Sequence, residues 1–189
     1  FTAYKDGYID WKPRNFKDDT GWADIAFGLK YALWVDEESQ TIFTPGIGYE
    51  TTSGDDDVLQ DDGDLVDIFA SFAMPIQDVN FIATGGVLVP TDSSDNSTAI
   101  HYHFHWDFEA AEGFWPLVEI NGYHYLNDAS RDAGLGTPLN FEGFDLTSFG
   151  SSDVNGNNVV VGGIGARAEL ADGVSVGAAW EVPLTERND

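Results

Sequence analysis

The sequence contains no cysteine, so disulfide bonds, thiolate zinc sites and thiol nucleophiles are all excluded. Basic residues are scarce: 8 lysines and arginines stand against 33 aspartates and glutamates, which gives a formal net charge of −25. A surface of that sign repels phosphate, so nucleic acid is excluded as a default partner. No uncharged apolar run reaches the roughly 18 residues that a membrane-spanning helix needs, and the best, Phe81 to Pro90, is about half that long.

The composition that remains is that of a folded, β-rich chain. Hydrophobic residues make up 42% of the 189 positions and aromatic residues 14%, a level that a disordered acidic segment does not reach. The length fits a single domain over residues 1–189. Because the first residue is Phe1 and no charged leader follows it, we expect either that an export signal has been removed or that the sequence begins inside a larger protein.

Apolar residues alternate with small or charged residues in the first part of the chain, and this period of two indicates β-strands. From Trp22 to Val35 one set of alternate residues is apolar throughout, and the other set includes Asp24 and Lys30. The segment Thr41–Thr51 repeats the pattern. The polar residues 36–40 between the two segments predict a hairpin loop.

Six further segments alternate in the same way, so eight strands are predicted. The six are Leu65–Met74, Val79–Val89, Thr98–Phe108, Trp115–Leu126, Asn158–Leu170 and Val174–Leu184. The connections alternate between short turns, such as 171–173, and long acidic segments, such as 52–64 and 127–157. Outer-membrane barrels have short turns at one end and longer loops at the other. The predicted fold class is an all-β, antiparallel up-and-down transmembrane β-barrel of eight or more strands.

The length of the strands and of their apolar faces favours a membrane barrel over a soluble one. Strands of about 10 to 13 residues match the requirement for crossing a bilayer better than the usual five or six. The apolar faces are also aromatic near their ends, as in 102–108 and 174–184. A soluble sandwich or barrel whose polar face meets water gives the same pattern strand by strand, so it remains the alternative.

In the membrane interpretation the polar faces of the strands turn inward. The residues expected to face the lumen are Asp24, Lys30, Glu50, Asp67, His101, His103, His105, Asp107, Glu119, Arg167, Glu169 and Glu181. Their acidic excess predicts that an open lumen prefers cations.

Two segments carry a family resemblance. Gly21–Tyr31 follows the pattern G-[aromatic/Leu]-x-D-[aliphatic]-x-x-G-x-[Lys/Arg]-Tyr. Val174–Thr185 looks like the pattern G-x-[Tyr/Trp]-E-x-P-Leu-T, with one more residue between Gly177 and Trp180. Both resemble strands of bacterial outer-membrane barrel proteins of the transporter-like, meta-pathway phenol-degradation-like group. The resemblance implies a location in the bacterial outer membrane and passage of small, often hydrophobic, molecules.

Relative to that group the chain starts late and stops without a final strand that ends in an aromatic residue. Single-chain bacterial barrels have an even number of strands, so we expect terminal strands to be missing. Phe1–Trp11 is expected to be the tail of a further strand.

The most unusual stretch is His101 to Asp107, in which three histidines alternate with aromatic residues. On a strand the three imidazoles and Asp107 share one face, about 6.5 to 7 Å apart. They predict a protonatable row on the polar face, and His103 with His105 is the candidate pair for a transition metal. The spacing of His103, His105 and Glu109 also matches the centre of a cupin metal motif, although Ser97 and Pro116 replace its glycines.

The acidic loops offer hard oxygen ligands in turn-prone backbone. Residues 55–57, 61–64, 92–95 and 153–157 are of this kind, and Asp153, Asn155 and Asn157 are the candidate calcium ligands. No loop completes an EF-hand. The alternative is that these loops only keep an external surface soluble.

No motif for catalysis is present: the sequence has no nucleophile elbow, no phosphate-binding glycine loop and no His-Glu-x-x-His. We therefore expect a protein that is not an enzyme and that has no cofactor other than calcium. The expected partners are outer-membrane lipid, an unidentified small solute, and a further copy or surface protein. Two other functions stay open: a soluble, secreted, cupin-like metal-binding barrel, and a calcium-binding cell-surface module.

Overall fold

The structure, a computed structural model, describes residues 4–7, 19–22, 24–54, 63–94, 96–130 and 154–185. All the regular secondary structure in this part of the chain is β. Among these residues no helix has the length and hydrophobicity needed to span a membrane. The strands are β1 (Tyr4–Gly7), β2 (Asp19–Trp22), β3 (Ile25–Lys30), β4 (Trp34–Asp36), β5 (Thr41–Thr51), β6 (Leu65–Ile76), β7 (Val79–Pro90), β8 (Ala99–Phe108), β9 (Phe114–Tyr125), β10 (Asn158–Ala171) and β11 (Val174–Pro183).

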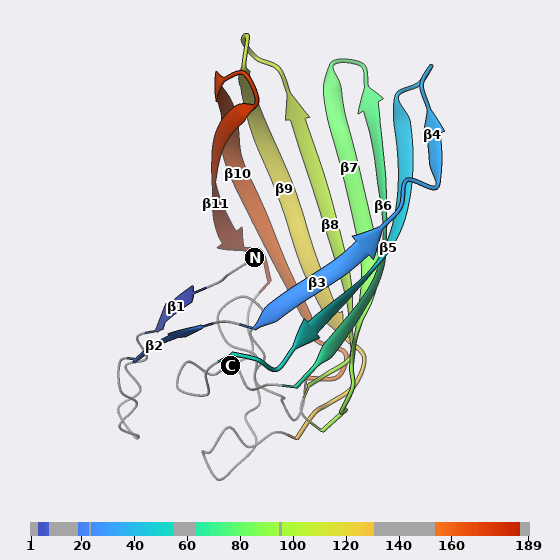
Figure 1. Ribbon diagram of the computed structural model, residues 1–189, viewed down its shortest axis with the longest axis vertical. Helices are drawn as coiled ribbons and strands as arrows, with labels where there is room; N and C mark the ends of the chain where they lie inside the picture. Colours follow the sequence, from blue (N-terminus) through green and yellow to red (C-terminus); the bar gives the residue numbers. More distant parts are fainter. Residues whose placement is uncertain are drawn as a thin grey trace.

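Nine strands form one antiparallel sheet in the order β3-β5-β6-β7-β8-β9-β10-β11, with β4 also paired to β5. Successive strands are neighbours in the sheet, so the fold is an up-and-down meander that curls toward one side (Figure 1). This confirms the all-β antiparallel up-and-down prediction. The edge strands β3 and β11 do not pair with each other in the described part of the chain, so the sheet is not closed.

The six later strand predictions are confirmed to within about two residues at each end. The strand expected near the N-terminus is present as β1, but it pairs with β2 in a separate two-stranded sheet and does not extend the main one.

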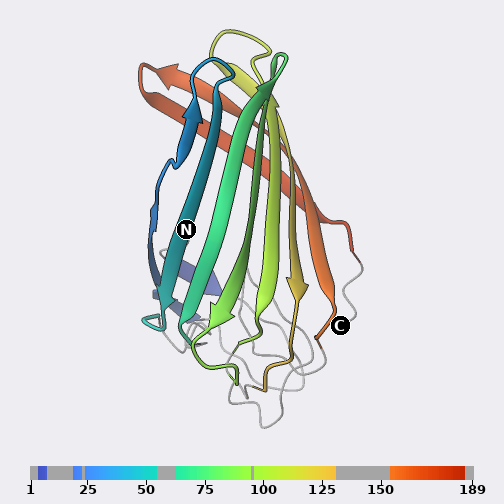
Figure 2. The ribbon, with the colours of Figure 1, turned by 90° about the vertical axis from the view of Figure 1, so that its right-hand side faces the viewer.

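Short turns join neighbouring strands at one end of the sheet (Figure 1). The turns 77–78 and 172–173 join β6 to β7 and β10 to β11. The strand ends that flank 52–64, 91–98 and 126–157 lie at the opposite end of the sheet. Gly173 has a φ of 75°, a left-handed conformation that glycine adopts without strain. Figure 2 shows that the sheet also twists, so that β10 and β11 run obliquely to β5 and β6.

The prediction of one continuous strand from Trp22 to Val35 is wrong, because a β-bulge divides it. Lys30 pairs with Gly46, whereas Trp34 pairs with Phe43, so the first strand has one extra residue between these pairs. The bulge lies opposite Pro45, which accepts a hydrogen bond from Tyr31 N (3.1 Å) but has no N–H to return. The extra residue reverses the alternation, and Val35 therefore lies on the polar side and Trp34 on the apolar side, opposite to the sequence pattern.

The cross-strand register divides the main sheet into two faces. We call the face that carries His101, His103 and His105 the histidine face, and the other the apolar face. In strands β3–β11 every charged residue except Asp36 lies on the histidine face. These residues are Lys30, Glu50, Asp67, Asp107, Glu119, Arg167, Glu169 and Glu181.

The histidine face is mixed rather than wholly polar. Val35, Ile42, Ala73 and Ile82 form one row across it, next to His105. The apolar face, in contrast, is almost uninterrupted and is exposed. Its exposed large residues include Phe27, Leu29, Trp34, Ile47, Ile68, Ile100, Phe108, Val118, Ile164, Val176 and Trp180.

Buried apolar residues are few and lie mainly near the loop end. Ala99, Tyr125 and Val154 form a small cluster against which Val159 packs. The described chain therefore has a core at its loop end and none beneath the middle of the sheet, where a soluble sheet would bury its apolar face.

Candidate functional site

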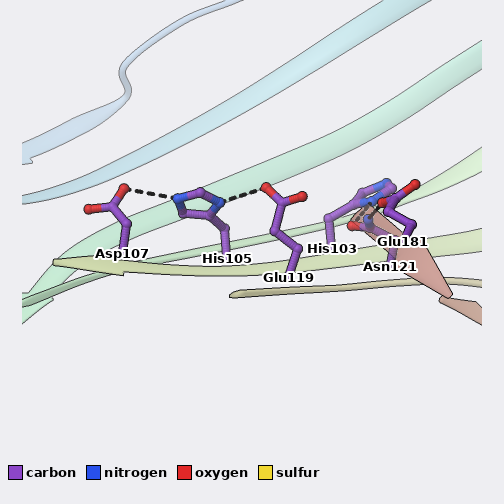
Figure 3. A network of polar contacts seen from close by, with 6 residues as sticks. All are labelled: His103, His105, Asp107, Glu119, Asn121 and Glu181. Atoms are coloured by element: carbon purple, nitrogen blue, oxygen red, sulfur yellow. Dashed lines mark hydrogen bonds and ion pairs between the residues drawn. The ribbon is translucent and has the colours of Figure 1, made fainter. Parts of the chain in front are cut away.

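The curvature of the sheet brings side chains from alternate strands together on the histidine face. Figure 3 shows the polar side chains of β8 and β9 rising on one side of the sheet, toward the ribbons of the early strands. A flat sheet holds strands two apart at about 9 to 10 Å, and only a concave surface with a small residue between them lets ordinary side chains meet.

His101 makes such a contact across β7. Its Nε2 lies 2.8 Å from Asp67 Oδ1 on β6, although β7 separates the two strands. Between them on β7 is Gly86, where a Cβ would lie 2.3 Å from His101 Nε2. The glycine therefore provides the space for the bridge, and the His101 side chain is only 6% exposed.

His103 continues the contacts in the other direction. Its Nε2 lies 3.0 Å from His101 Nδ1, and its Nδ1 lies 3.0 Å from Asn121 Oδ1 on β9. Asn121 Nδ2 in turn donates to Glu181 Oε1 on β11 at 2.9 Å. This second contact also joins alternate strands. A continuous series of hydrogen bonds thus runs from Asp67 through two imidazoles to Glu181.

His105 lies between two carboxylates. Its Nδ1 is 2.7 Å from Glu119 Oε1 and its Nε2 is 2.9 Å from Asp107 Oδ2 (Figure 3). Asp107 is 9% exposed and also accepts a hydrogen bond from Asn80 Nδ2 at 2.7 Å. The two carboxylates of this group therefore come from β9 and from the strand of His105 itself, and β7 supplies the donor Asn80.

The register places eleven of the twelve predicted lumen residues on the histidine face. The hydrogen bonds described above involve seven of these eleven residues, together with Asn80 and Asn121. Arg167 lies with its Cζ 4.7 Å from the centre of the Trp115 ring, a cation–π contact on the same face. Asp24 differs from the rest: it lies before β3, is 8% exposed, and accepts hydrogen bonds from Ser53 N and Gly54 N, both at 2.7 Å.

Other acidic residues of the loop end also bind backbone amides. Asp128 Oδ1 accepts from Val154 N and Asn155 N, both at 2.8 Å. Asp64 accepts from Thr52 Oγ1 at 2.6 Å, from the Tyr49 hydroxyl, and from Thr52 N at 2.8 Å. These hydrogen bonds, the one from the Thr52 side chain above all, lower the pKa of Asp64 to about 2.

Hydrogen bonds from Ser94 likewise lower the pKa of Asp92, and the bond from the Ser94 hydroxyl has a larger effect than the bond from its N–H. Part of the acidic excess is therefore structural: these carboxylates hold the loops by accepting backbone and hydroxyl hydrogen bonds.

The metal candidates are distributed as follows. His103 and His105 share a face, but each is bonded to other side chains, and the Glu109 carboxylate accepts from Gly113 N (3.1 Å) in the turn beyond β8. Asn155 and Asn157 lie in the turn before β10, and Asp153 lies outside the described residues. Within the described ranges no group of three or more histidine, aspartate or glutamate side chains is arranged to hold a metal ion.

Sequence patterns identify the histidines and their carboxylates but not the residues that connect them. Gly86 and Asn80 carry no signal that separates them from the other glycines and asparagines of the chain. Asn121 could be placed on the polar face by alternation, but its role between His103 and Glu181 depends on the order of the strands.

Comparison of the chain with protein-family models, with curated proteins and with solved structures gave no significant match.

Proposed function

We propose that this chain forms the wall of an outer-membrane β-barrel, with its apolar face against lipid and its histidine face toward a lumen through which small solutes pass. The observation that carries the proposal is the separation of the strand charges. All but one of them lie on one face, and the opposite face exposes large apolar side chains from β3 to β11.

Water is an unfavourable environment for such a face. Burial of apolar surface is worth roughly 25 cal/mol per Å², and monomeric soluble proteins rarely expose contiguous apolar patches above a few hundred Å². In the described part of the chain no second layer covers the apolar face. Acyl chains would cover it without any further protein.

The dimensions of the strands support the same environment. β5 to β11 are 10 to 14 residues long, and a tilted membrane strand needs roughly 9 to 11. Short turns at one end and long acidic connections at the other match the asymmetry of outer-membrane barrels. Closure would then require pairing of the edges at β3 and β11.

Tryptophan fluorescence provides a direct test, because Trp106 and Trp115 lie on neighbouring strands but on opposite faces. Two single-tryptophan variants of the full chain, retaining Trp106 or Trp115 with phenylalanine at the other five positions, are folded into vesicles. Lipids brominated on their acyl chains should quench Trp106 strongly and Trp115 several-fold less.

The controls are the same two variants in vesicles without bromine and in buffer without lipid. Equal quenching of both tryptophans would contradict the orientation of the faces. If both variants fold in lipid-free buffer and neither is quenched when vesicles are added, the sheet does not reside in a membrane.

A further inference from the structure

We infer that the three histidines hold two protons more than neutral imidazoles would, and that these two protons tie β6, β8 and β9 together across the histidine face. The inference rests on counting donors and acceptors, and it does not depend on the proposed function. A neutral imidazole has one N–H and one acceptor nitrogen, and a carboxylate oxygen only accepts.

A neutral His105 ring has one proton too few for its two contacts. Both ring nitrogens face carboxylate oxygens, at 2.7 Å from Glu119 and 2.9 Å from Asp107. A neutral ring would leave one nitrogen lone pair directly opposite an anionic oxygen. Two hydrogen bonds therefore require two protons on this group, one more than a neutral histidine between two carboxylates supplies.

The orientation of Asn121 fixes the count at the other two histidines. Only its Nδ2 can donate to Glu181, so its Oδ1 is the acceptor for His103 Nδ1. The contacts Asp67–His101, His101–His103 and His103–Asn121 then need three protons, whereas two neutral rings supply two. The pair holds one extra proton, which can lie on either side of the 3.0 Å contact between the rings.

The surroundings balance these charges. The charged and titratable groups that face the row are Asp67 from β6, Asp107 from β8, Glu119 and Tyr123 from β9, Arg167 from β10 and Glu181 from β11. From β7 the row meets Asn80, Ile82, Thr84 and Gly86, none of which is charged. Carboxylates thus outnumber the single arginine, which favours retention of both protons.

Loss of either proton to water would break contacts that join strands. At 2.7 to 2.9 Å an imidazole lone pair and a carboxylate oxygen repel, and the His101 ring already occupies the space above Gly86 on β7. The bridge to Asp67 and the contacts of His105 should therefore open as the pH rises, and close again as it falls.

The test is a nitrogen-15 NMR spectrum of the folded full chain labelled at histidine, since the two ring-nitrogen shifts report directly which nitrogens carry protons. At pH 7.5 His105 should be an imidazolium and the His101–His103 pair should share one extra proton. His124 is the internal control: among the described residues its ring is hydrogen-bonded to the Asn158 amide oxygen, at 2.9 Å, and this contact needs no extra proton.

Two nearly isosteric variants remove the requirement for a proton. Glu119→Gln and Asp67→Asn each offer an amide that can donate to the ring, so each should release one proton, and the histidines concerned should give the ring-nitrogen shifts of neutral imidazoles at pH 7.5. Glu169→Gln is the matched control, because Glu169 lies on the same face but makes no hydrogen bond to a histidine among the described residues. Thermal stability should fall with rising pH in the parent and the control, and depend less on pH in the two variants.

Three neutral rings at pH 7.5 in the parent, or ring-nitrogen shifts unchanged from the parent in both variants, would overturn the inference. Ring-nitrogen shifts of a metal complex, with zinc or nickel in the purified protein, would overturn it too, because a metal would then occupy the positions assigned to the protons.

Discussion

The Asp64 carboxylate holds the connection between β5 and β6 through Thr52 and Tyr49. Its pKa is about 2, below the ordinary 3.8, because the charged form accepts these hydrogen bonds. A depressed pKa means that the contribution to stability is complete above pH 3.8 and is lost as the pH falls through about 2.

We therefore expect the amide resonance of Thr52 to keep its folded position at pH 4 and to move only as the pH approaches 2. Asp64→Ala should abolish this titration and shift the resonance at every pH. Asp172→Ala, in the turn at the opposite end of the sheet, is the control and should leave it unchanged. A Thr52 titration centred near pH 4 in the parent would show that the carboxylate is not held as described.

For single residues, the sequence predicts the face of the sheet on which a side chain lies better than it predicts the side chain's hydrogen-bond partner. Alternation suffices to place Glu119 and His105 on the polar side, because the period of a strand is two. It cannot predict the bridge from His101 to Asp67, which spans two strands and requires both the curvature of the sheet and a glycine at position 86.

Within β7, Gly85 and Gly86 have opposite environments although they are adjacent. A Cβ at Gly86 would lie 2.3 Å from His101 Nε2 and 2.7 Å from Ile68 O, whereas the nearest atom to a Cβ at Gly85 is His101 O at 3.9 Å. The first distances force the backbone or the bridge to move, and the second is an ordinary contact.

Gly86→Ala should therefore destabilise the folded chain by about 1–3 kcal/mol, the usual range for overpacking, and Gly85→Ala should be nearly neutral. Urea unfolding of the two variants in the same vesicles measures the difference. Equal stabilities would mean that the space above position 86 is not used by His101.

Prediction of the strands fails at one place, the bulge between Lys30 and Trp34. The extents of β5 to β11 follow from alternation because each of these strands keeps its period to the end. The bulge between Lys30 and Trp34 does not, since it arises from the missing N–H of Pro45 on a different strand. A proline inside an apparent strand is the signal that could have indicated it.

For the molecule as a whole, the net charge of the histidine face predicts whether a lumen lined by it favours cations or anions. Its strands carry Glu50, Asp67, Asp107, Glu119, Glu169 and Glu181 against Lys30 and Arg167, and even two extra protons on the histidines leave an acidic excess. A lumen lined by this face should favour cations.

Reversal potentials across planar bilayers, measured in a potassium chloride gradient, should therefore indicate cation preference. Glu50→Lys with Glu169→Lys should shift the reversal potential toward that of chloride, whereas Asp172→Lys, in a turn, should shift it less. Anion preference in the parent would contradict the assignment of this face to the lumen.

The meander has a consequence for how such a chain can change in length. Each pairing in the main sheet joins strands that follow one another in sequence, apart from the step across β4, so no strand depends on a distant segment for its hydrogen bonds. Loss of the hairpin β10–β11 would expose β9 as a new edge and leave every other ladder intact. Gain of a hairpin would likewise add two strands without rearranging the rest. The sheet can therefore vary by whole hairpins, and duplication or deletion of about thirty residues is the step in which we expect its width to evolve.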